Sequence, residues 1–208
     1  MTPWLVPVTL RGETVTLEPL TAAHHDDLVA ATRDGDLASL WYTTIPGPGE
    51  MAQEIDRRLA LLERGTMLPF AVVERAHGTA VGMTTYMNVD AAVRRVEIGS
   101  TWYRARVRRT AVNTESKLLL LGHAFDALEC IAVEFRTATH NRASRRAIER
   151  LGAKLDGVLR CHTRFANGAL RDTCVYSITA AEWPAVRAGL TFELTRPRNA
   201  RESQPNGY

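Results

Sequence analysis

Two spacings of apolar residues alternate along the chain. In one, apolar and polar residues follow each other in turn, which is typical of a strand with one buried face. In the other, apolar residues recur every three or four positions, as on the buried side of a helix. The strand pattern covers residues 8–20, 69–76, 80–90, 94–103, 131–139, 153–165 and 170–178. The helical pattern covers residues 21–35, 46–65, 113–129 and 141–152, with one or two further helical turns over 180–190.

The order of these elements predicts the fold class. A strand or short hairpin is followed by two helices, three strands, a helix, a strand, a helix and two strands. Glycine-containing turns at 77–79 and 166–168 predict hairpins, which join antiparallel strands. The strand–helix–strand unit over 94–139 predicts one parallel pair. We therefore expect an α+β fold with a mixed, mostly antiparallel sheet of about seven strands, one domain over residues 1–194, and a loose tail over 195–208.

Composition and charge argue against several classes of protein. A net charge of +3, from 26 basic and 23 acidic residues, is too small to indicate a nucleic-acid-binding protein. No apolar run approaches the ~18 residues of a membrane span, so we expect no membrane partner. Three cysteines without a Cys-x-x-Cys pair favour a reduced, cytoplasmic protein, and six scattered histidines predict no metal site.

A cluster of positive charge precedes the helix predicted over 113–129. Four arginines fall within residues 104–109, and a Thr-Ala-Val-Asn segment follows them. The first N–H groups of a helix have no helical partner, and together with the helix dipole they attract anions such as phosphate. Arginine side chains add paired donors for phosphate oxygens. The alternatives are a solvated basic loop, or arginines paired with a carboxylate such as Asp90 or Glu115.

Several motifs, in order along residues 8–190, carry a resemblance to a known family. The segment RRTAVN over 108–113 stands where that family carries the pyrophosphate loop Gln/Arg-x-x-Gly-x-Gly/Ala. VEIGSTWY resembles the strand before this loop, and NTESKLLLLGHAF the helix after it. NRASRRAIERLGA and RDTCVYSITAAEW resemble the next helix and the closing strand. The chain thus resembles the GNAT superfamily of acyl-CoA-dependent N-acyltransferases, and within it the bacterial ribosomal-protein N-terminal acetyltransferases.

The resemblance implies a GNAT-like fold, acetyl-CoA as co-substrate, no metal, a primary amine as acceptor and a homodimer. It also implies contacts with CoA from the end of one strand, the basic turn and the start of the later helix: Trp102, Tyr103, Arg108, Arg109, Thr110, Ala111, Val112, Asn113, Asn141 and Ser144. Two residues depart from the loop motif, since Ala111 replaces the usual glycine and Asn113 the final small residue. An alanine fits there only if its φ is negative. Arg104 or Arg106 could compensate by reaching the 3′-phosphate.

Glu97 is the first candidate for a general base. It alternates with apolar neighbours, so it faces the other side of its strand. The resemblance implies a carboxylate base on this strand and a backbone N–H group that polarises the thioester carbonyl. Gly99 predicts a bulge, and bulge donors aimed at that carbonyl would act as an oxyanion hole. The alternative is a solvent-facing Glu97 that pairs with Arg94 or Arg136.

Asn141 and Ser144 open the helix predicted over 141–152. Asn141 suits the N-cap position, and the resemblance adds contact with the pantetheine arm of CoA. Ser144 shares a helix face with Ile148 and Leu151, which predicts a buried hydroxyl in need of a partner. Since this helix has no tyrosine, the resemblance implies that Ser144 could donate a proton to the departing thiolate.

Two further regions are candidates for the acceptor site. Trp41 and Tyr42, between the first two helices, correspond to a region that lines the amine pocket in the family; the alternative is that Trp41 packs on the sheet. His162 shares a strand face with two arginines, and Asp172 lies across the hairpin. His162 is therefore a second candidate for the base. A buried pair of Asp172 with an arginine, holding the hairpin, is the alternative.

Two hypotheses for the function follow. The first is an acetyl-CoA-dependent N-acetyltransferase that works by direct transfer, since no cysteine has an obvious histidine partner. The second is a non-catalytic module that binds CoA or nucleic acid through residues 104–113. A nucleic-acid-binding module needs exposed aromatic side chains beside its arginines, and Trp102 and Tyr103 are the candidates.

Overall fold

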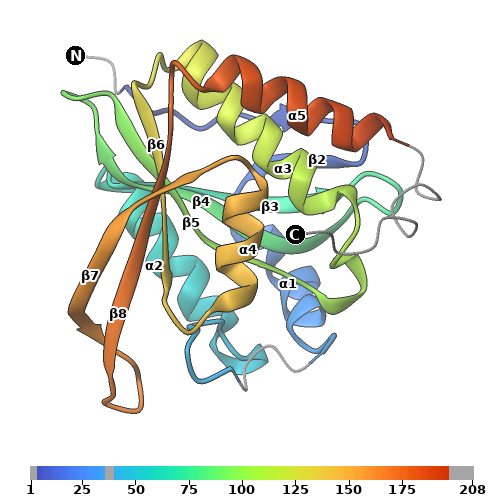
Figure 1. The fold of residues 1–208 in the computed structure, drawn as a ribbon. Coiled ribbons are helices and arrows are strands. Elements are labelled where there is room, and N and C mark those ends of the chain that lie inside the picture. Colours follow the sequence, from blue (N-terminus) through green and yellow to red (C-terminus); the bar gives the residue numbers. More distant parts are fainter. Residues whose placement is uncertain (1–3, 36–39, 197–208) are drawn as a thin grey trace.

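The structure is a computed structural model that describes residues 4–35 and 40–196. Its centre is one eight-stranded sheet with the order β1-β2-β3-β4-β5-β6-β8-β7 (Figure 1). The strands are β1 (Leu10–Arg11), β2 (Val15–Pro19), β3 (Met67–Glu74), β4 (Thr79–Asp90), β5 (Arg95–Tyr103), β6 (Ala132–Ala138), β7 (Lys154–Arg164) and β8 (Leu170–Thr179). The α-helices of the described residues are α1 (His25–Thr32), α2 (Met51–Glu63), α3 (Ala111–Gly122), α4 (Arg142–Arg150) and α5 (Trp183–Thr195).

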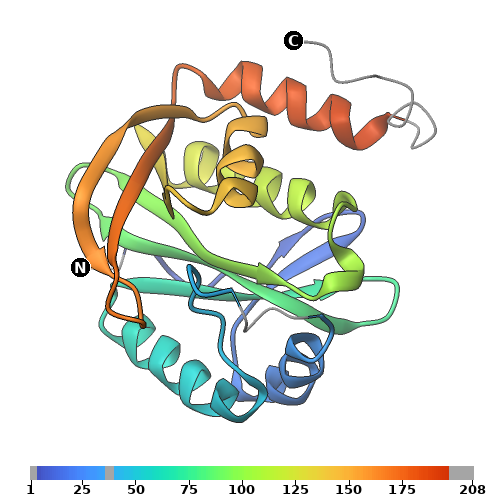
Figure 2. The ribbon, with the colours of Figure 1, turned by 60° about the horizontal axis from the view of Figure 1, so that its bottom comes forward.

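Helices cover both faces of the sheet. Figure 2 shows α1 and α2 below the sheet and α3, α4 and α5 above it. One buried apolar cluster, which includes Tyr86 and Phe135, joins the sheet to α3 and α5. A second cluster, which includes Met83 and Trp102, joins the sheet to α1 and α2. Successive residues of a strand point to opposite faces, so a central strand such as β4 contributes to both clusters.

The predicted order of elements and the mixed α+β sheet are confirmed. The sheet has eight strands rather than about seven, because residues 8–20 form a hairpin of two strands. The last helix is longer than predicted: α5 has 13 residues, and Trp183 and Leu190 on one of its sides are buried in the apolar cluster. The predicted tail starts at Thr195, where α5 ends, and its residues 197–208 lie outside the described residues.

The predicted parallel pair forms between β5 and β6, and it is short. The two strands pair at three successive positions, the last of which places Glu97 opposite Glu134. Beyond this point β5 continues to Tyr103 and β6 to Ala138 without pairing with each other. β6 stays paired with β8 instead. Beyond this point, the facing edges of β5 and β6 therefore carry backbone N–H and C=O groups that are not hydrogen-bonded between the two strands.

A bulge interrupts β5 in the part that has no partner in β6. Between Gly99 and Trp102, the residues Ser100 and Thr101 stand opposite the single residue Thr84 of β4. Ser100 has a φ of 47°, a left-handed conformation of the kind found in bulges. The bulge that the glycine predicts is therefore present, in the unpaired part of β5.

Glu115 binds the backbone of the N-terminal hairpin and does not pair with an arginine. Its carboxylate accepts hydrogen bonds from the N–H groups of Glu13, Thr14 and Val15 over 2.7, 2.8 and 2.8 Å. A Cβ atom on Gly12 would lie 2.6 Å from the Glu115 carboxyl carbon, so the turn needs a glycine to approach this closely. The suggested pairing of Glu115 with the basic turn is wrong, because the carboxylate is already used by backbone donors.

Candidate active site

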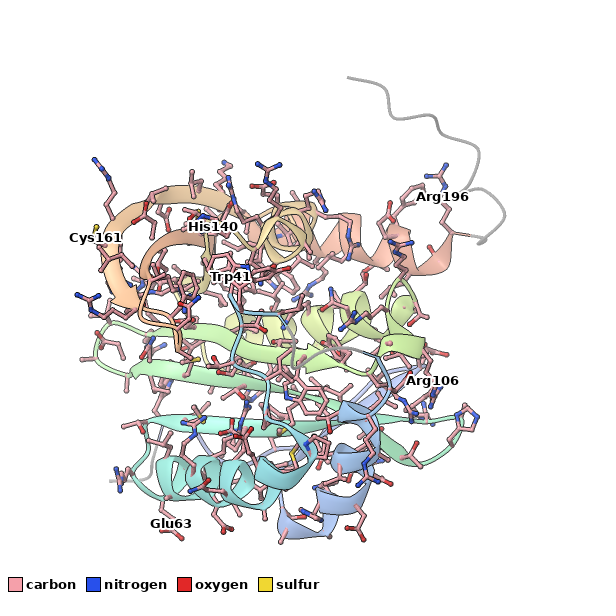
Figure 3. All side chains as sticks on the ribbon, turned by 90° about the horizontal axis from the view of Figure 1, so that it is seen from below. Trp41, Glu63, Arg106, His140, Cys161 and Arg196 are labelled. Atoms are coloured by element: carbon pink, nitrogen blue, oxygen red, sulfur yellow. The ribbon has the colours of Figure 1, made fainter. Side chains whose placement is uncertain are left out.

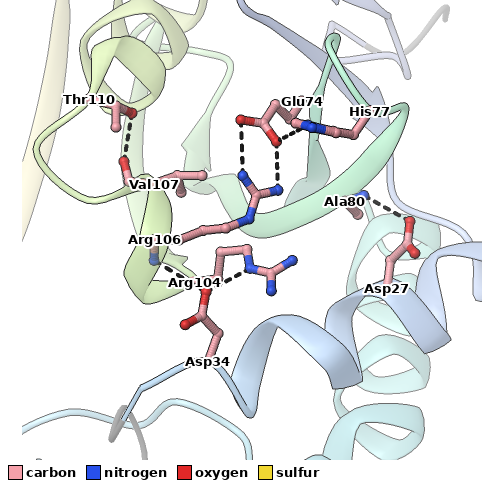
Figure 4. Close-up of polar contacts among 9 residues, drawn as sticks. All are labelled: Asp27, Asp34, Glu74, His77, Ala80, Arg104, Arg106, Val107 and Thr110. Carbon is pink, nitrogen blue, oxygen red and sulfur yellow. Dashed lines mark hydrogen bonds and ion pairs between the residues drawn. The ribbon is translucent and has the colours of Figure 1, made fainter.

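Two of the four clustered arginines are held by carboxylates (Figure 4). Arg104 Nε donates to Asp34 Oδ2 over 2.8 Å, and Arg106 Nη2 donates to Glu74 Oε2 over 2.6 Å. These hydrogen bonds lower the pKa of both carboxyl groups. The expected reach of Arg104 or Arg106 to a 3′-phosphate is therefore not seen. Both side chains instead anchor the turn to the end of α1 and to β3.

Arg108 and Arg109 are exposed just before α3, and the side chain of neither forms an ion pair or hydrogen bond with any residue of the described chain. Thr110 caps the helix, with its Oγ1 accepting from the Val112 N–H over 3.3 Å. Ala111 is the first residue of α3 and has no positive φ, so an alanine replaces the usual glycine without strain. Two unpaired guanidinium groups beside a helix N-terminus suit an anion.

Several other residues predicted to contact CoA have buried side chains. Trp102 is 4% exposed and packs between the sheet and α1 and α2, and Val112 is 1% exposed. Burial raises the pKa of the Tyr103 hydroxyl. Asn113 is half-buried in the first turn of α3. Trp102, Tyr103 and Val112 can therefore offer a ligand little beyond their backbone, and Trp102 does not supply the exposed aromatic surface that a nucleic-acid-binding module needs.

Glu97 is buried, with 5% of its surface exposed, so it does not face solvent, although the suggested ion pair with Arg136 is present. Its side chain lies on the face of the sheet opposite to Val96 and Ile98, which belong to the cluster under α3. Asn88 Nδ2 donates to Glu97 Oε2 over 2.6 Å. A Cβ atom on Gly99 would lie 2.9 Å from Glu97 Oε1, so this glycine leaves room for the carboxylate.

The charges around Glu97 are mixed, and burial dominates its pKa. Arg136 Nε lies 3.7 Å from Glu97 Oε2 and also pairs with Glu134. Arg171 of β8 acts on the same carboxylate through its charge. Burial raises the pKa of Glu97, while Asn88 and the two arginines oppose this rise. A carboxylate with a raised pKa is a stronger base than one in water, which suits proton abstraction.

Asn141 and Ser144 lie at the start of α4 as predicted. Asn141 is the N-cap, since its Oδ1 accepts from the Ser144 N–H over 3.0 Å. Ser144 is only half-buried, so the expected fully buried hydroxyl is wrong. The buried residues on this side are Ile148 and Leu151, one and two turns further along the chain. The Ser144 hydroxyl is therefore accessible in part.

Trp41 and Tyr42 lie outside the two buried apolar clusters. Trp41 is 49% exposed, so the alternative that it packs on the sheet is wrong. Its ring contacts Tyr42, His140 and Phe165 at centroid distances of 5.6, 5.4 and 4.9 Å. Figure 3 shows Trp41 beside His140, which follows β6. An aromatic group thus joins the segment before α2 to the ends of β6 and β7.

His162 lies on an irregular part of β7. The pairing of β7 with β8 shifts between Leu159 and Thr163, and Cys161 has a φ of 50°, so the regular alternation expected for this strand is broken. His162 Nδ1 is 3.2 Å from Thr173 Oγ1. Asp172 accepts from the Cys161 N–H over 2.7 Å rather than pairing with an arginine, so the suggested buried Asp172–arginine pair is wrong.

No group of histidine, cysteine and acidic residues in the part of the chain described by the structure could hold a metal ion. None of the helices within residues 4–35 and 40–196 is long and apolar enough to cross a membrane.

Comparison with known proteins identifies the family. The sequence profile described as an acetyltransferase (GNAT) domain matches residues 14–154. The chain belongs to the GNAT acetyltransferase family. The matched stretch contains Glu97, the bulge, the basic turn and Ser144, so the features described above lie within the family's own domain. The expectation of an acetyl-CoA-dependent acetyltransferase is thereby confirmed.

Solved structures of GNAT acetyltransferases share the fold. A GCN5-related N-acetyltransferase from Brucella melitensis is 31% identical, with a TM-score of 0.85 over 95% of this chain and 89% of that one. RimJ from Mycobacterium smegmatis, solved in complex with CoA-disulfide, is 22% identical, with a TM-score of 0.74 over 90% of this chain and 93% of that one. The second likeness shows the fold alone. No curated protein matches the chain in sequence.

Two buried cations near the bulge of this GNAT domain are not among the residues that the sequence predicts for the site. Lys117 of α3 is 6% exposed and Arg58 of α2 is 2% exposed. A signal was present in the spacing, because Lys117 precedes Leu120, Leu121 and Ala124 by three, four and seven residues. Leu120 and Leu121 are buried residues of α3, and Ala124 is buried in the helical turn that follows it. Arg58 holds the corresponding place on the buried face of α2.

Proposed function

We propose that this GNAT enzyme transfers the acetyl group of acetyl-CoA directly to a primary amine within a ternary complex. The position of Glu97 carries the proposal: a buried carboxylate stands at the last paired residue before β5 and β6 separate. A peptide N-terminus or a small-molecule amine is the proposed acceptor. By its resemblance to the ribosomal-protein acetyltransferases, we further propose a cytoplasmic homodimer.

The residues around the split between β5 and β6 fit acetyl-CoA. Arg108 and Arg109 would bind the pyrophosphate together with the first N–H groups of α3. Asn141 and Ser144 at the start of α4 would contact the pantetheine arm. The unpaired edges of β5 and β6 offer backbone donors and acceptors for its amide groups.

Glu97 serves as general base in this proposal. Acetyl-CoA supplies a thioester whose carbonyl carbon bonds to the amine nitrogen while the carbon–sulfur bond breaks. Glu97 takes the proton that the amine loses, directly or through a water molecule, and the bulge N–H groups polarise the carbonyl. The thiolate that leaves takes a proton from Ser144 or from solvent; with a thiol pKa of ~8.5 it needs little help.

The acceptor would approach from the side of Trp41 and Tyr42. Glu97 faces the side of the sheet that carries α1 and α2. The segment with Trp41 leads into α2, and Trp41 itself contacts His140, which follows β6 (Figure 3). A half-exposed aromatic group can pack on the acceptor's carbon skeleton without binding its amine. His162 stays a candidate substrate contact on β7.

Direct transfer is favoured because the cysteines are poorly placed for an acyl-enzyme. Cys130 and Cys174 are buried, and burial raises the pKa of Cys130 to about 11. A thiol with such a pKa holds very little thiolate at neutral pH. Cys161 is exposed, and its backbone rather than its thiol contacts Asp172. An acyl-enzyme intermediate therefore has no evident nucleophile among these residues.

Thiol release from acetyl-CoA, measured with pooled candidate amines, tests the proposed function. The pools comprise peptides with free N-termini, free amino acids, polyamines and aminated antibiotics. We expect one pool to accelerate thiol release and to yield an amine heavier by one acetyl group. Release that never exceeds the hydrolysis background, with a protein that binds acetyl-CoA, would contradict catalysis and favour the non-catalytic CoA-binding module.

For Ser144→Ala we expect weaker binding and nearly unchanged turnover. Loss of one hydrogen bond of ~1 kcal/mol corresponds to roughly a fivefold rise in the Kd for CoA. The kcat at saturation should hold, because the thiolate is a good leaving group. Calorimetry and steady-state rates separate the two effects. A fall in kcat with an unchanged Kd would assign proton donation to Ser144, and no change in either would leave it a role in the fold alone.

A further inference from the structure

Two buried cations reach the β5 bulge from opposite faces of the sheet. Thr84 and Thr85 are successive residues of β4, both fully buried, and their side chains point to opposite faces. Lys117 of α3 binds Thr84, and Arg58 of α2 binds Thr85. Each cation also reaches the strand beyond, β5, at its bulge.

On the α3 side, Lys117 anchors a network of hydroxyl groups. Its Nζ donates to Thr84 Oγ1 over 3.1 Å and to Thr101 Oγ1 over 2.8 Å. The two hydroxyl oxygens are 2.8 Å apart, and the Thr101 hydroxyl donates to the Gly99 carbonyl over 3.3 Å. If the Thr84 hydroxyl donates to Thr101 Oγ1 while the Thr101 hydroxyl donates to the Gly99 carbonyl, each of the two hydroxyl hydrogens has one acceptor. The lysine is thus tied to a carbonyl group of the bulge.

Lys117 is an unusual occupant of this position. The residues that follow it on the same helix face, Leu120 and Leu121, are apolar, and no carboxylate of the described residues pairs with it. Burial lowers the pKa of its amine to about 7. A buried amine without an ion-pair partner destabilises a fold, and packing alone would be served by methionine or leucine. Compared with methionine or leucine, a lysine at this position adds the hydrogen bonds to Thr84 and Thr101.

On the α2 side, Arg58 completes the arrangement. Its Nε donates to Glu54 Oε1 over 2.7 Å and its Nη1 to Thr85 Oγ1 over 2.6 Å. Its Nη2 donates to the Ser100 carbonyl over 3.4 Å. Two successive carbonyl groups of the bulge, those of Gly99 and Ser100, therefore accept hydrogen bonds from side chains that start on opposite faces of the sheet.

Holding these carbonyl groups also sets the direction of the bulge N–H groups. In a trans peptide the C=O of one residue and the N–H of the next point in opposite directions, and the described chain has no cis peptide bond. We propose that Lys117, through Thr101, and Arg58 are positioning residues that orient the Ser100 and Thr101 N–H groups toward the acetyl carbonyl. This inference rests on the proposed acetyl transfer and adds the residues that shape its carbonyl-binding site.

Infrared spectroscopy of bound acetyl-CoA, labelled with ¹³C at the acetyl carbonyl, tests the proposal without turnover. Hydrogen bonds to the carbonyl lower its stretching frequency, so wild-type protein should shift the band downward on binding. We expect Lys117→Met to lose at least half of that shift while the Kd for CoA, which has no acetyl carbonyl, stays within about twofold. The kcat should fall roughly 10-fold to 100-fold, less than for direct loss of an oxyanion donor.

Matched variants separate positioning from general packing. Thr101→Val removes the hydroxyl that reaches Gly99 and should repeat the Lys117→Met effect, whereas Thr101→Ser keeps the hydroxyl and should restore the shift. Thr16→Val removes a buried hydroxyl of the same sheet, on β2, and should change neither the band nor kcat. Should Lys117→Met fail to fold, the Thr101 pair carries the same test.

The possible outcomes distinguish this inference from the proposed function. If Lys117→Met and Thr101→Val both show the same band shift as the wild type, the positioning role is wrong and the proposed acetyl transfer is unaffected. An equal loss of CoA affinity and of the band shift in these variants would also overturn it, because that pattern indicates a role in the whole site. Failure of the wild-type protein to bind acetyl-CoA would overturn both.

Discussion

Glu97→Gln should lower kcat by roughly 10²–10⁴-fold while the Tm and the affinity for acetyl-CoA stay close to those of the wild type. The amide has nearly the same shape as the carboxylate and can still accept a hydrogen bond from Asn88, so folding should be preserved. It cannot take a proton from the amine. Steady-state rates and thermal melts of the purified variant measure both effects.

The pH dependence identifies the chemical role of Glu97. Its pKa is raised by burial, and a base acts only when ionised, so wild-type activity should fall toward low pH earlier than an ordinary carboxylate would dictate. An α-amine has a pKa of ~7.7–8.0, so above that pH it is neutral without help and the defect of Glu97→Gln should shrink. Glu134→Gln, at the paired position on β6, is the matched control and should cost little activity. A loss that does not vary with pH, or none, would shift the role to His162 or a bound water.

Replacing both unpaired arginines of the basic turn should weaken acetyl-CoA binding by roughly 10²-fold. A hydrogen bond to a charged group contributes ~1.5–3 kcal/mol, about tenfold or more in Kd for each arginine. We would use Arg108→Ala with Arg109→Asn, because Arg109 has a φ of 62° and asparagine tolerates that conformation better than alanine. Calorimetry at two salt concentrations should also show a flatter salt dependence in the variant.

Arg106→Ala is the matched control for this prediction, since its side chain is already paired with Glu74. It should leave the Kd for acetyl-CoA within about twofold of the wild type. Wild-type affinity in the double variant would contradict the phosphate role of the turn. A larger loss in Arg106→Ala than in the double variant would place the phosphates on the other side of the turn.

The features that the sequence predicts well depend on neighbouring residues. The hairpin turns, the N-cap at Asn141, and the bulge beyond Gly99 follow from local residue preferences. The side of the strand on which Glu97 lies follows from alternation alone. These local rules, with the order of the motifs, predicted both the family and the fold.

The features that the sequence does not predict depend on residues far apart in the chain. Burial of Glu97 requires that β4 and β6 flank it, and the partners of Arg104 and Arg106 lie just after α1 and on β3. Glu115 reaches a hairpin 100 residues earlier in the chain. A local pattern shows that Lys117 lies on an apolar helix face, but only the packed sheet supplies Thr84 and Thr101 as its partners.

A crystal structure of the protein with bound CoA tests the central claim most directly. We predict the pantetheine arm between β5 and β6 beyond Glu97, the pyrophosphate at Arg108, Arg109 and the first turn of α3, and the thiol on the side of the sheet where Glu97 lies. Density for CoA elsewhere on the surface, with the edges of β5 and β6 free of ligand, would contradict the account.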